Sequence, residues 1–549
     1  MSGVLVIVPV VPLLAALAII VSGSTAATAA RAAVAASAVA FAAALVTLVT
    51  VGIDGPLSIV ATDPDGSAVV GLVADRVGAI LITLTTFVGL IAQSFASRSL
   101  RGDPRARRFH VLALVLTAST SMVAIAATGT GFVVGWITTS LVLVGLIGHR
   151  ALWPAAVSAQ RRTGRSFLIG DSVLVLALLV TLATVGDIDM RSVGASAGAL
   201  GAEQIAGLDA LAVVAMMLVV AGIARSALVP IHRWLPSTLA APTPVSALLH
   251  AGVINGAGVL LIRFSPIFAS AATAMAVAFA IGALTALLAT AVMLVRTDVK
   301  GGLVWSTVGQ MGFMVMQLGV GAFAAALFHI VGHALYKAAM FLGAGGAISA
   351  HHRQQQRPHL GTAERTALTS VPVRLLVGLI VPSVAFALAL AIIDPHLTAA
   401  ATILIVVFGV LSVGRAANGW LASTPFSAVA TITTAAFGVV GGVFAYVGGI
   451  TVFEHFVVDV VPYDVPAAVG PVWVTATLVG IALFVTVVAF TPGIRGQALR
   501  RRVYSWLLST GSATLRSATS PALATTRSPG LTTAVESDVT PPVTVGDPV

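Results

Sequence analysis

Apolar residues along this 549-residue chain gather into long runs that short polar stretches separate. A helix needs about 20 mostly apolar residues to cross the hydrocarbon core of a membrane. By this criterion the sequence predicts an all-α, polytopic membrane protein with about 13–15 transmembrane helices. The predicted spans are residues 4–22, 27–52, 77–97, 109–127, 130–148, 167–186, 206–228, 244–262, 268–295, 302–318, 322–348, 371–393, 399–414, 427–450 and 471–492.

The composition supports this interpretation and excludes several classes of protein. Hydrophobic residues make up 58% of the chain and charged residues only 9%, whereas a soluble chain carries about 25% charged residues. A soluble enzyme and a disordered scaffold are therefore excluded. The chain has no cysteine, so disulfides, thiolate metal sites and iron–sulfur clusters are excluded as well.

The loops between the predicted spans alternate in charge, and this alternation predicts the topology. The basic loops hold Arg98, Arg101, Arg105, Arg107 and Arg108, then Arg150, Arg161, Arg162 and Arg165, then Arg296 and Lys300, then Arg353, Arg357 and Arg365, and finally Arg495, Arg500, Arg501 and Arg502. The acidic loops hold Asp54, Asp63, Asp65, Asp187, Asp189, Glu203, Asp394, Glu454, Asp459 and Asp464. The positive-inside rule places the basic loops in the cytoplasm. We therefore expect a multi-pass protein of the cell membrane with an external N-terminus and a cytoplasmic C-terminal tail.

The composition changes after Pro492, which divides the chain into two parts. We assign residues 1–492 to the transmembrane bundle and residues 493–549 to a cytoplasmic tail. From residue 503 onward the sequence is rich in Ser, Thr, Pro and Ala with little apolar periodicity. Such segments cannot bury enough apolar surface to fold, so we expect the tail to be disordered.

Ionisable residues at membrane depth are candidates for function because they are costly to bury in lipid. Arg225 lies at the end of the seventh predicted span and is followed by Pro230 and Pro236. Proline removes a backbone donor and interrupts a helix, so a discontinuous helix is expected here. Two interpretations stay open for Arg225: a buried functional charge, or a side chain that extends to the cytoplasmic interface.

A second cluster follows in the eighth predicted span, where Pro244 suits the first turn of a helix. His250 and Asn255 then fall well inside the apolar run. Histidine can hold and release a proton near neutral pH. A histidine bonded to the backbone of a neighbouring helix is the equally weighted alternative.

The third cluster is the most informative. His329, His333 and Lys337 are spaced four residues apart in the span 322–348, so they share one face of a helix. Three titratable groups on one face are costly in lipid, which requires that face to line the bundle interior. There they can carry protons along a hydrated chain, since desolvation disfavours the charged form of a buried lysine. A purely structural polar interface is the alternative.

Other charged residues have simpler interpretations. Asp171 begins the sixth predicted span shortly after Arg165, and Asp298 and Lys300 lie in a short turn before the tenth. Ion pairs at helix ends are sufficient to explain these residues, although a part in ion translocation is open for Asp171 and Lys300. His351, His352 and His359 in a basic loop lack the spacing of a metal site, so we expect a solvated surface, and no metal or cofactor in this chain.

Several motifs give the sequence a family resemblance. They are GW (135–136), HRWLP (232–236), APTPVSALLHAG (241–252), DVK (298–300), STVGQMGFM (306–314) and LFHIVGHALYKAAMFL (327–342). Together they resemble the proton-translocating, antiporter-like subunits of respiratory complex I, subunit L (chain 5) among them. The resemblance covers residues 1–350 well and residues 370–490 only by hydropathy. It implies the antiporter-like fold with discontinuous helices.

The chain departs from complex I subunits at three positions. The glutamate expected after the fifth-span tryptophan is Ile137, the seventh-span lysine is Arg225, and residues 371–393 contain no lysine. The long run from His232 to Pro266 instead looks most like DabB, the membrane subunit of a two-part inorganic carbon pump. The implied ion carriers are His250, His329, His333 and Lys337. Arg225 is then a fixed charge or gate, because arginine does not normally deprotonate.

This resemblance implies a partner and a mechanism. The membrane subunit would pass H⁺ or Na⁺ down its gradient and so drive directional hydration of CO₂ by a cytoplasmic, zinc-containing DabA-type partner. This chain would be a transporter subunit, and the zinc would belong to the partner. Three alternatives stay open: a proton-translocating complex I subunit, the large subunit of a multisubunit Na⁺/H⁺ antiporter, and a partner-binding scaffold whose ion sites have degenerated.

Overall fold

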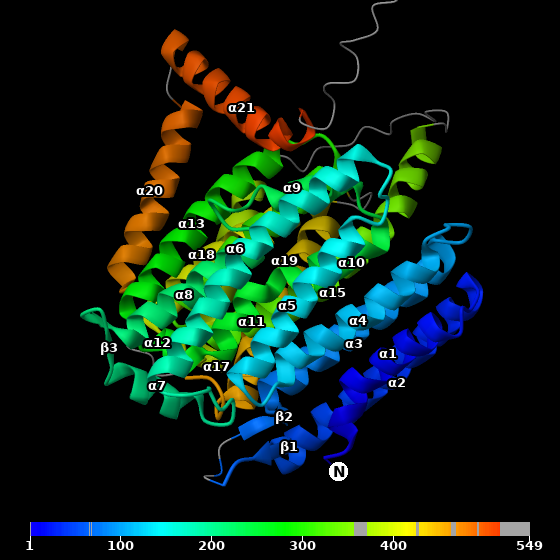
Figure 1. Cartoon of the computed structure of the whole chain (residues 1–549). Coiled ribbons are helices and arrows are strands. Elements are labelled where there is room, and N and C mark those ends of the chain that lie inside the picture. Colours follow the sequence, from blue (N-terminus) through cyan, green and yellow to red (C-terminus); the bar gives the residue numbers. More distant parts are fainter. Residues whose placement is uncertain are drawn as a thin grey trace, which may run out of the picture.

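Figure 1 shows the computed structural model of the chain, a bundle of long helices that run between two ends of the molecule. It describes residues 2–64, 66, 68–355, 371–423, 428–462, 468–490 and 493–516. The long helices are α1 (Val4–Val21), α2 (Ala26–Asp54), α3 (Arg76–Ser99), α4 (Ala106–Ile125), α5 (Gly129–Ile147), α6 (Pro154–Thr184), α8 (Ala210–Arg225), α13 (Ala272–Val295), α14 (Val299–Gly319), α15 (Phe323–Gln355), α17 (Val381–Ile393), α18 (Ala399–Ser423), α19 (Ala428–Val457), α20 (Pro471–Phe490) and α21 (Gly493–Arg516).

Short elements connect these helices. They are α7 (Val193–Gly201), α9 (Trp234–Ser237), α10 (Thr243–Ala251), α11 (Gly256–Arg263), α12 (Ser265–Ala269), α16 (Val371–Leu375), and the strands β1 (Leu57–Thr62), β2 (Ala68–Ala74), β3 (Gln204–Ile205) and β4 (Leu208–Asp209). The strands form two antiparallel hairpins, which the hydropathy pattern did not predict. Both hairpins lie at the lower end of the bundle in Figure 1.

Helix covers most of each of the fifteen predicted apolar segments, although the segment 206–228 begins in a β-hairpin and the segment 244–262 is interrupted. Twelve helices of the described residues are long and apolar enough to cross a membrane. The remaining three predicted spans are α8, α14 and α20. The helix α8 has 16 residues, α14 places Gln310 and Gln317 among its apolar residues, and α20 is apolar over the 20 residues Pro471–Phe490. The prediction of a polytopic helical membrane protein is confirmed.

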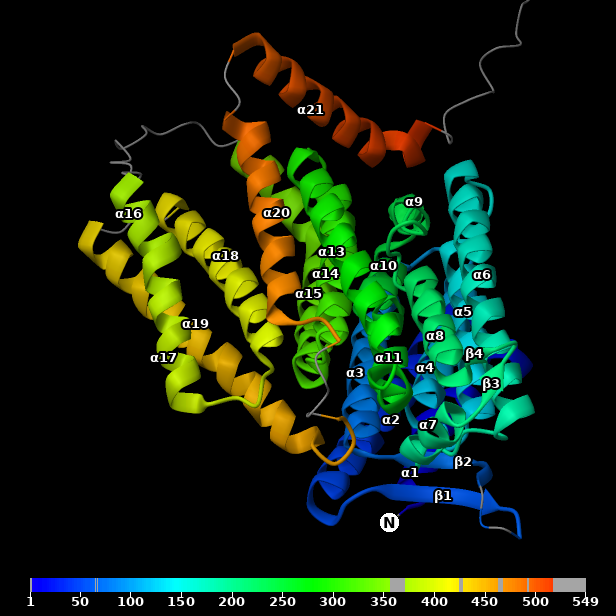
Figure 2. The same cartoon turned by 90° about the vertical axis from the view of Figure 1, so that its left-hand side faces the viewer.

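The charged loops sort to the two ends of the bundle as the alternation predicts. The end with Arg101, Arg150, Arg233 and Arg296, at the top of Figures 1 and 2, is called the basic end here. The opposite end carries the N-terminus and is called the acidic end, with Asp63, Asp187, Glu203, Asp394 and Asp459. Which side of the membrane each end faces stays a prediction of the positive-inside rule.

Two interruptions divide helices in the middle of the chain. The helix α8 ends at Arg225, and the proline-rich segment that follows forms only the short α9. A second break separates α10 from α11 at Gly252, whose φ of −109° and ψ of −89° lie outside the helical region. The first interruption confirms the prediction made from the prolines, whereas the second was not predicted. Broken helices are tolerated at membrane depth where protein covers them.

Two predicted boundaries need correction. The helix α6 begins at Pro154 rather than at residue 167, because Pro154 occupies the first turn and the polar residues up to Arg165 continue the helix toward the basic end. The predicted tail begins with α21, so residues 493–516 are helical, and the rest lies outside the described residues. Figure 2 shows α21 lying across the basic end. The expectation of disorder does not hold for these residues. Val503, Leu507 and Gly511 are spaced four residues apart, as on one face of a helix, and this face lies against the bundle.

Candidate functional site

The predicted stripe on α15 faces the bundle interior. The side chain of Lys337 is fully buried, and its Nζ donates to Ser306 Oγ at 2.5 Å and to Leu303 O at 3.3 Å. Both acceptors lie on α14 and both are neutral. No acidic side chain pairs with Lys337 among the described residues. The site therefore holds an amine with polar contacts but without a counter-ion.

The histidines of the stripe stack one turn apart. The His329 and His333 rings are 5.9 Å apart between centroids, and the spacing of 1.5 Å per residue places Lys337 about 12 Å along the helix from His329. His329 Nε2 and both ring nitrogens of His333 have no hydrogen-bond partner within the described part of the chain. Buried polar atoms in proteins are generally paired with protein or ordered water, so these nitrogens can each bind a water molecule.

His250 approaches the same stripe from α10. Its ring stacks on Phe341 of α15 with centroids 4.2 Å apart, and its side chain is buried. The α10 and α15 helices pack against each other. Asn255, at the break between α10 and α11, donates through Nδ2 to Ala251 O at 3.0 Å. The structure thus brings His250 to the stripe, whereas Asn255 belongs to the broken helix.

Arg225 and Asp171 form a separate buried centre. Arg225 Nη2 donates to Asp171 Oδ1 at 3.2 Å, to Ser140 Oγ at 2.6 Å and to Trp136 O at 3.0 Å. The guanidinium also lies over the rings of Trp136, at 4.1 Å, and Phe167, at 4.6 Å. Trp136 Nε1 donates to the same Asp171 oxygen at 2.9 Å. Arg225 is thus enclosed in the bundle and does not extend to the cytoplasmic interface.

The interpretation of Asp171 as a helix-end residue is wrong. Because α6 begins at Pro154, Asp171 lies in the middle of that helix and faces Arg225 instead of Arg165. The family resemblance leads one to expect a carboxylate at position 137, where this chain has isoleucine. Asp171 brings a carboxylate to the same tryptophan and arginine from a different helix.

The backbone at the two helix breaks is satisfied by side chains. Ser226 Oγ donates to Ile254 O at 2.5 Å and accepts from Ala257 N at 2.8 Å, so one hydroxyl joins the end of α8 to the start of α11. Trp234 Nε1 donates to Ala224 O at 3.0 Å. Buried backbone groups without partners are costly, and these two contacts explain how α8 can end inside the protein. No pattern in the sequence signals the role of Ser226.

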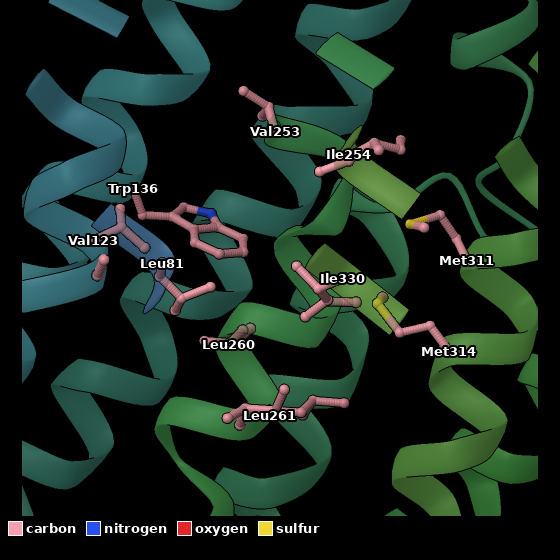
Figure 3. Close-up of a cluster of buried hydrophobic side chains, with 14 of the residues drawn as sticks. Leu81, Val123, Trp136, Val253, Ile254, Leu260, Leu261, Met311, Met314 and Ile330 are labelled. Carbon is pink, nitrogen blue, oxygen red and sulfur yellow. The ribbon is translucent and has the colours of Figure 1, made fainter. Parts of the chain in front are cut away.

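A cluster of apolar side chains lies between Trp136 of the arginine centre and α14. In Figure 3, Trp136 lies on one side of the cluster and Met311 and Met314 on the other, with Ile254 and Ile330 between them. Ile330 follows His329 on α15 and points toward the Trp136 side of the cluster. One cavity is lined by Arg225, Asn255 and Ile330, so α15 borders the arginine centre through an apolar side chain.

The other predicted residues lie outside these centres. Lys300 is half-buried in the first turn of α14, at the basic end. Asp298 caps that helix by accepting from Gly301 N at 2.7 Å and pairs with Arg296, as the helix-end interpretation predicts. The described residues contain no group of three or more His, Asp or Glu side chains that could hold a metal ion. The side chains of His351 and His352, and all of His359, lie outside the described residues.

Comparison with known proteins assigns the family. A family model described as NADH:quinone oxidoreductase/Mrp antiporter, TM, matches residues 129–414, more than half of the chain. The chain belongs to this family. The matched range contains Arg225, Asp171, His250 and the α15 stripe, so both buried centres lie within the family's transmembrane domain.

Several curated relatives are similar over about half of their length. The chain is 35% identical over 292 residues to the probable inorganic carbon transporter subunit DabB1 of Halothiobacillus neapolitanus, covering 52% of each chain. It is 32% identical to the corresponding DabB subunit of Bacillus subtilis, covering 56% of this chain and 59% of that one. It is 31% identical to NAD(P)H-quinone oxidoreductase chain 5 of a Synechocystis species, covering 51% of this chain and 41% of that one.

Two solved structures share the fold. The structure of the Mrp complex from a Dietzia species aligns with a TM-score of 0.56 at 20% identity, covering 94% of this chain and 60% of that one. The membrane-bound sulfane sulfur reductase, an archaeal respiratory complex, aligns with a TM-score of 0.57 at 16% identity, covering 94% and 98%. The antiporter-like fold predicted from the motifs is confirmed.

Proposed function

We propose that this chain is the ion-conducting membrane subunit of an inorganic carbon transporter. It passes protons down their gradient through the stripe on α15. That flow drives directional conversion of CO₂ and water to bicarbonate and a proton in a cytoplasmic DabA-type partner that holds zinc. The proposal combines the buried stripe with the similarity to the DabB subunits.

The observation that carries the proposal is the buried, uncompensated Lys337 at the end of two histidines. An ammonium in the interior without a counter-ion is costly, whereas the neutral amine is not. A lysine in this position can accept a proton when one arrives along the histidines and can release it again. His250 adds a fourth titratable group from α10, which is the arrangement a proton relay needs.

Arg225 has a different role in this mechanism. Its guanidinium stays charged, and Asp171 compensates that charge at 3.2 Å. We infer that this pair acts as a fixed electrostatic element or gate beside the break between α8 and α11. Movement of the pair would change the field at the stripe without any proton passing through the arginine.

The alternative within the family is a proton-translocating subunit of a quinone oxidoreductase or a Na⁺/H⁺ antiporter. The similarity to chain 5 proteins favours it. The absence of a fifth-span glutamate and of a lysine in α16 and α17 disfavours it. The same absences fit a scaffold whose relay no longer works, and loss of activity on changing Lys337 distinguishes a working relay from that case.

The test is reconstitution of bicarbonate accumulation. A host without carbonic anhydrase that grows only at elevated CO₂ is given this chain, a DabA-type protein, or both. We expect growth at ambient CO₂ only with both proteins, and loss of growth with a protonophore. The proposal would be overturned if both proteins accumulate in the membrane as a complex and growth at ambient CO₂ is still absent. Co-purification from native membranes with quinone oxidoreductase subunits instead would support the alternative.

A further inference from the structure

A cavity opens at the acidic end where α15 begins. It has a volume of about 210 Å³ and is enclosed by the first turn of α15, the loop between α17 and α18, and the last turns of α19. The α15 side is lined by Ala324 and Ala325, and α18 adds Ala401. Small side chains at these positions leave the space open. Neither the predicted site nor the proposed relay uses this cavity.

Titratable side chains line the opposite wall. Glu454 on α19 accepts a hydrogen bond from the backbone N–H of His396 at 3.2 Å, and no cationic side chain pairs with it among the described residues. The His455 ring lies 6.1 Å from the His396 ring, and His455 Nδ1 lies 2.8 Å from Thr451 O. If Nδ1 donates to that carbonyl, Nε2 is the acceptor nitrogen. The cavity therefore holds one carboxylate and two imidazoles.

The remaining charged groups at this corner are already engaged or exposed. Arg76 pairs with Asp459 at 2.6 Å, beside Phe456 and next to His455. Asp394, which ends α17, is exposed. Neither Asp394 nor the Arg76–Asp459 pair lines the cavity, so Glu454 is its carboxylate.

The geometry of α15 connects the cavity to the stripe. Ala325 lines the cavity and precedes His329 by four residues, so positions 325, 329, 333 and 337 form one continuous row. Four residues, about 6 Å along the helix axis, separate Ala325 from His329. The part of the cavity wall formed by Ala325 is thus about one helical turn from His329, the first histidine of the row.

We propose that this cavity is the mouth of the proton route at the acidic end, with Glu454 as the carboxylate that takes up protons and His396 and His455 as its exchanging neighbours. This inference rests on the proposed relay through α15. The chemistry of the row favours protons over Na⁺, because imidazole and amine groups bind protons, whereas hard cations require several oxygen ligands. The four positions of the row are an alanine, two histidines and a lysine, so the row itself offers no oxygen ligand.

The first test uses matched acidic-to-amide changes in the transporter with its partner. Glu454→Gln is expected to lower bicarbonate accumulation at least tenfold, and Glu454→Asp is expected to restore part of it. Asp394→Asn is the control, because it makes the same change at the same end outside the cavity, and asparagine tolerates the left-handed backbone at that position (φ 51°). Lys337→Ala shows how much bicarbonate accumulation remains when the proposed relay is interrupted.

The outcomes separate this inference from the function it rests on. If Glu454→Gln is fully active while Lys337→Ala is inactive, the cavity is not the mouth of the proton route, but the proposed relay through α15 is retained. Full activity of Lys337→Ala overturns the relay itself. If accumulation depends on external Na⁺ and Glu454→Gln weakens the apparent affinity for Na⁺, the assignment of a proton mouth is wrong.

A second measurement keeps the inference testable should Glu454→Gln fail to accumulate. The chain has no cysteine, so a single cysteine can be introduced at the half-buried Ala324. The positive-inside rule places this end outside. A membrane-impermeant cationic thiosulfonate added to intact cells is expected to abolish activity of Ala324→Cys and to react faster than an anionic reagent. Val70→Cys, exposed at the same end, should be labelled without loss of activity. Labelling of Ala324→Cys without inhibition would overturn the inference.

Discussion

Arg225 and Lys337 are both buried cations in one bundle, but their surroundings differ. Arg225 has a carboxylate at 3.2 Å, aromatic rings nearby and two further oxygen acceptors. Lys337 has a hydroxyl, a carbonyl and, at 5.8 Å, the Tyr336 ring, but no carboxylate pairs with it among the described residues. The first environment stabilises a permanent charge, whereas the second tolerates loss of the charge. This difference is the basis of the proposal that Arg225 is a static charge and Lys337 a proton-exchanging group.

The largest expected effect comes from breaking the arginine centre. Asp171→Asn leaves Arg225 buried without a counter-ion, which destabilises proteins by about 3–5 kcal/mol. We expect loss of most folded protein in detergent, measured by thermal unfolding. Adding Arg225→Met should recover much of that stability. Equal stability of Asp171→Asn and the unchanged protein would show that the pair does not hold this charge in place.

The rigid surroundings of Arg225 give the second prediction. Ser226→Ala leaves the Ile254 carbonyl and the Ala257 N–H without their partner, and an unsatisfied buried group costs about 1–3 kcal/mol. We expect a lower unfolding temperature. Ser270→Ala, which removes a hydroxyl from an exposed helix end, is the matched control and should have little effect. Similar melting of both variants would contradict the bridging role.

The lysine centre should respond in activity rather than stability. Ser306→Ala removes the 2.5 Å contact to Lys337 Nζ. One hydrogen bond contributes about 1 kcal/mol, which corresponds to about a fivefold change in rate. We expect coupled bicarbonate accumulation to fall by about that factor while the protein stays folded. Ser306→Thr retains the hydroxyl and should retain activity, and a loss in this variant as large as in Ser306→Ala would exclude the hydroxyl as the cause.

The smallest effect is expected at the basic end, away from both centres. Burial alone would raise the pKa of Asp103, but hydrogen bonds from the Arg105 backbone and from His149 outweigh it and hold the pKa below its usual value. A lowered carboxyl pKa stabilises the folded state above the unfolded pKa, about 4, and this contribution is lost as the pH falls through the folded value. Asp103→Asn should therefore reduce stability slightly at neutral pH and flatten the acid limb of the unfolding profile. An unchanged acid limb would contradict this.

The lysine centre can be predicted from the sequence, whereas the carboxylate partner of Arg225 cannot. The four-residue spacing of His329, His333 and Lys337 lies within one helix, so helical geometry alone predicts their common face. The contact of Asp171 with Arg225 joins α6 to α8 and depends on packing. The predicted start of this helix, residue 167, is thirteen residues later than the observed start of α6 at Pro154. With the predicted start, Asp171 falls at a helix end instead of in the buried middle of the helix.

The features that the sequence could not predict share this cause. The cavity at the acidic end joins Glu454 to His396, which are 58 residues apart, and neither residue belongs to a motif. The break at Gly252 has no proline to signal it. In both cases the structure depends on contacts between segments that no local pattern encodes.

Reciprocal exchange of the two cations tests the central claim most directly. Coupled bicarbonate accumulation is measured for Lys337→Arg and Arg225→Lys, each with its partner protein and with membrane levels matched. We predict that Lys337→Arg is inactive, because arginine keeps the charge but does not release a proton at working pH. Arg225→Lys should keep a substantial part of the activity, because lysine can still pair with Asp171. Full activity of Lys337→Arg would contradict the account, since a fixed positive charge would then suffice at the stripe.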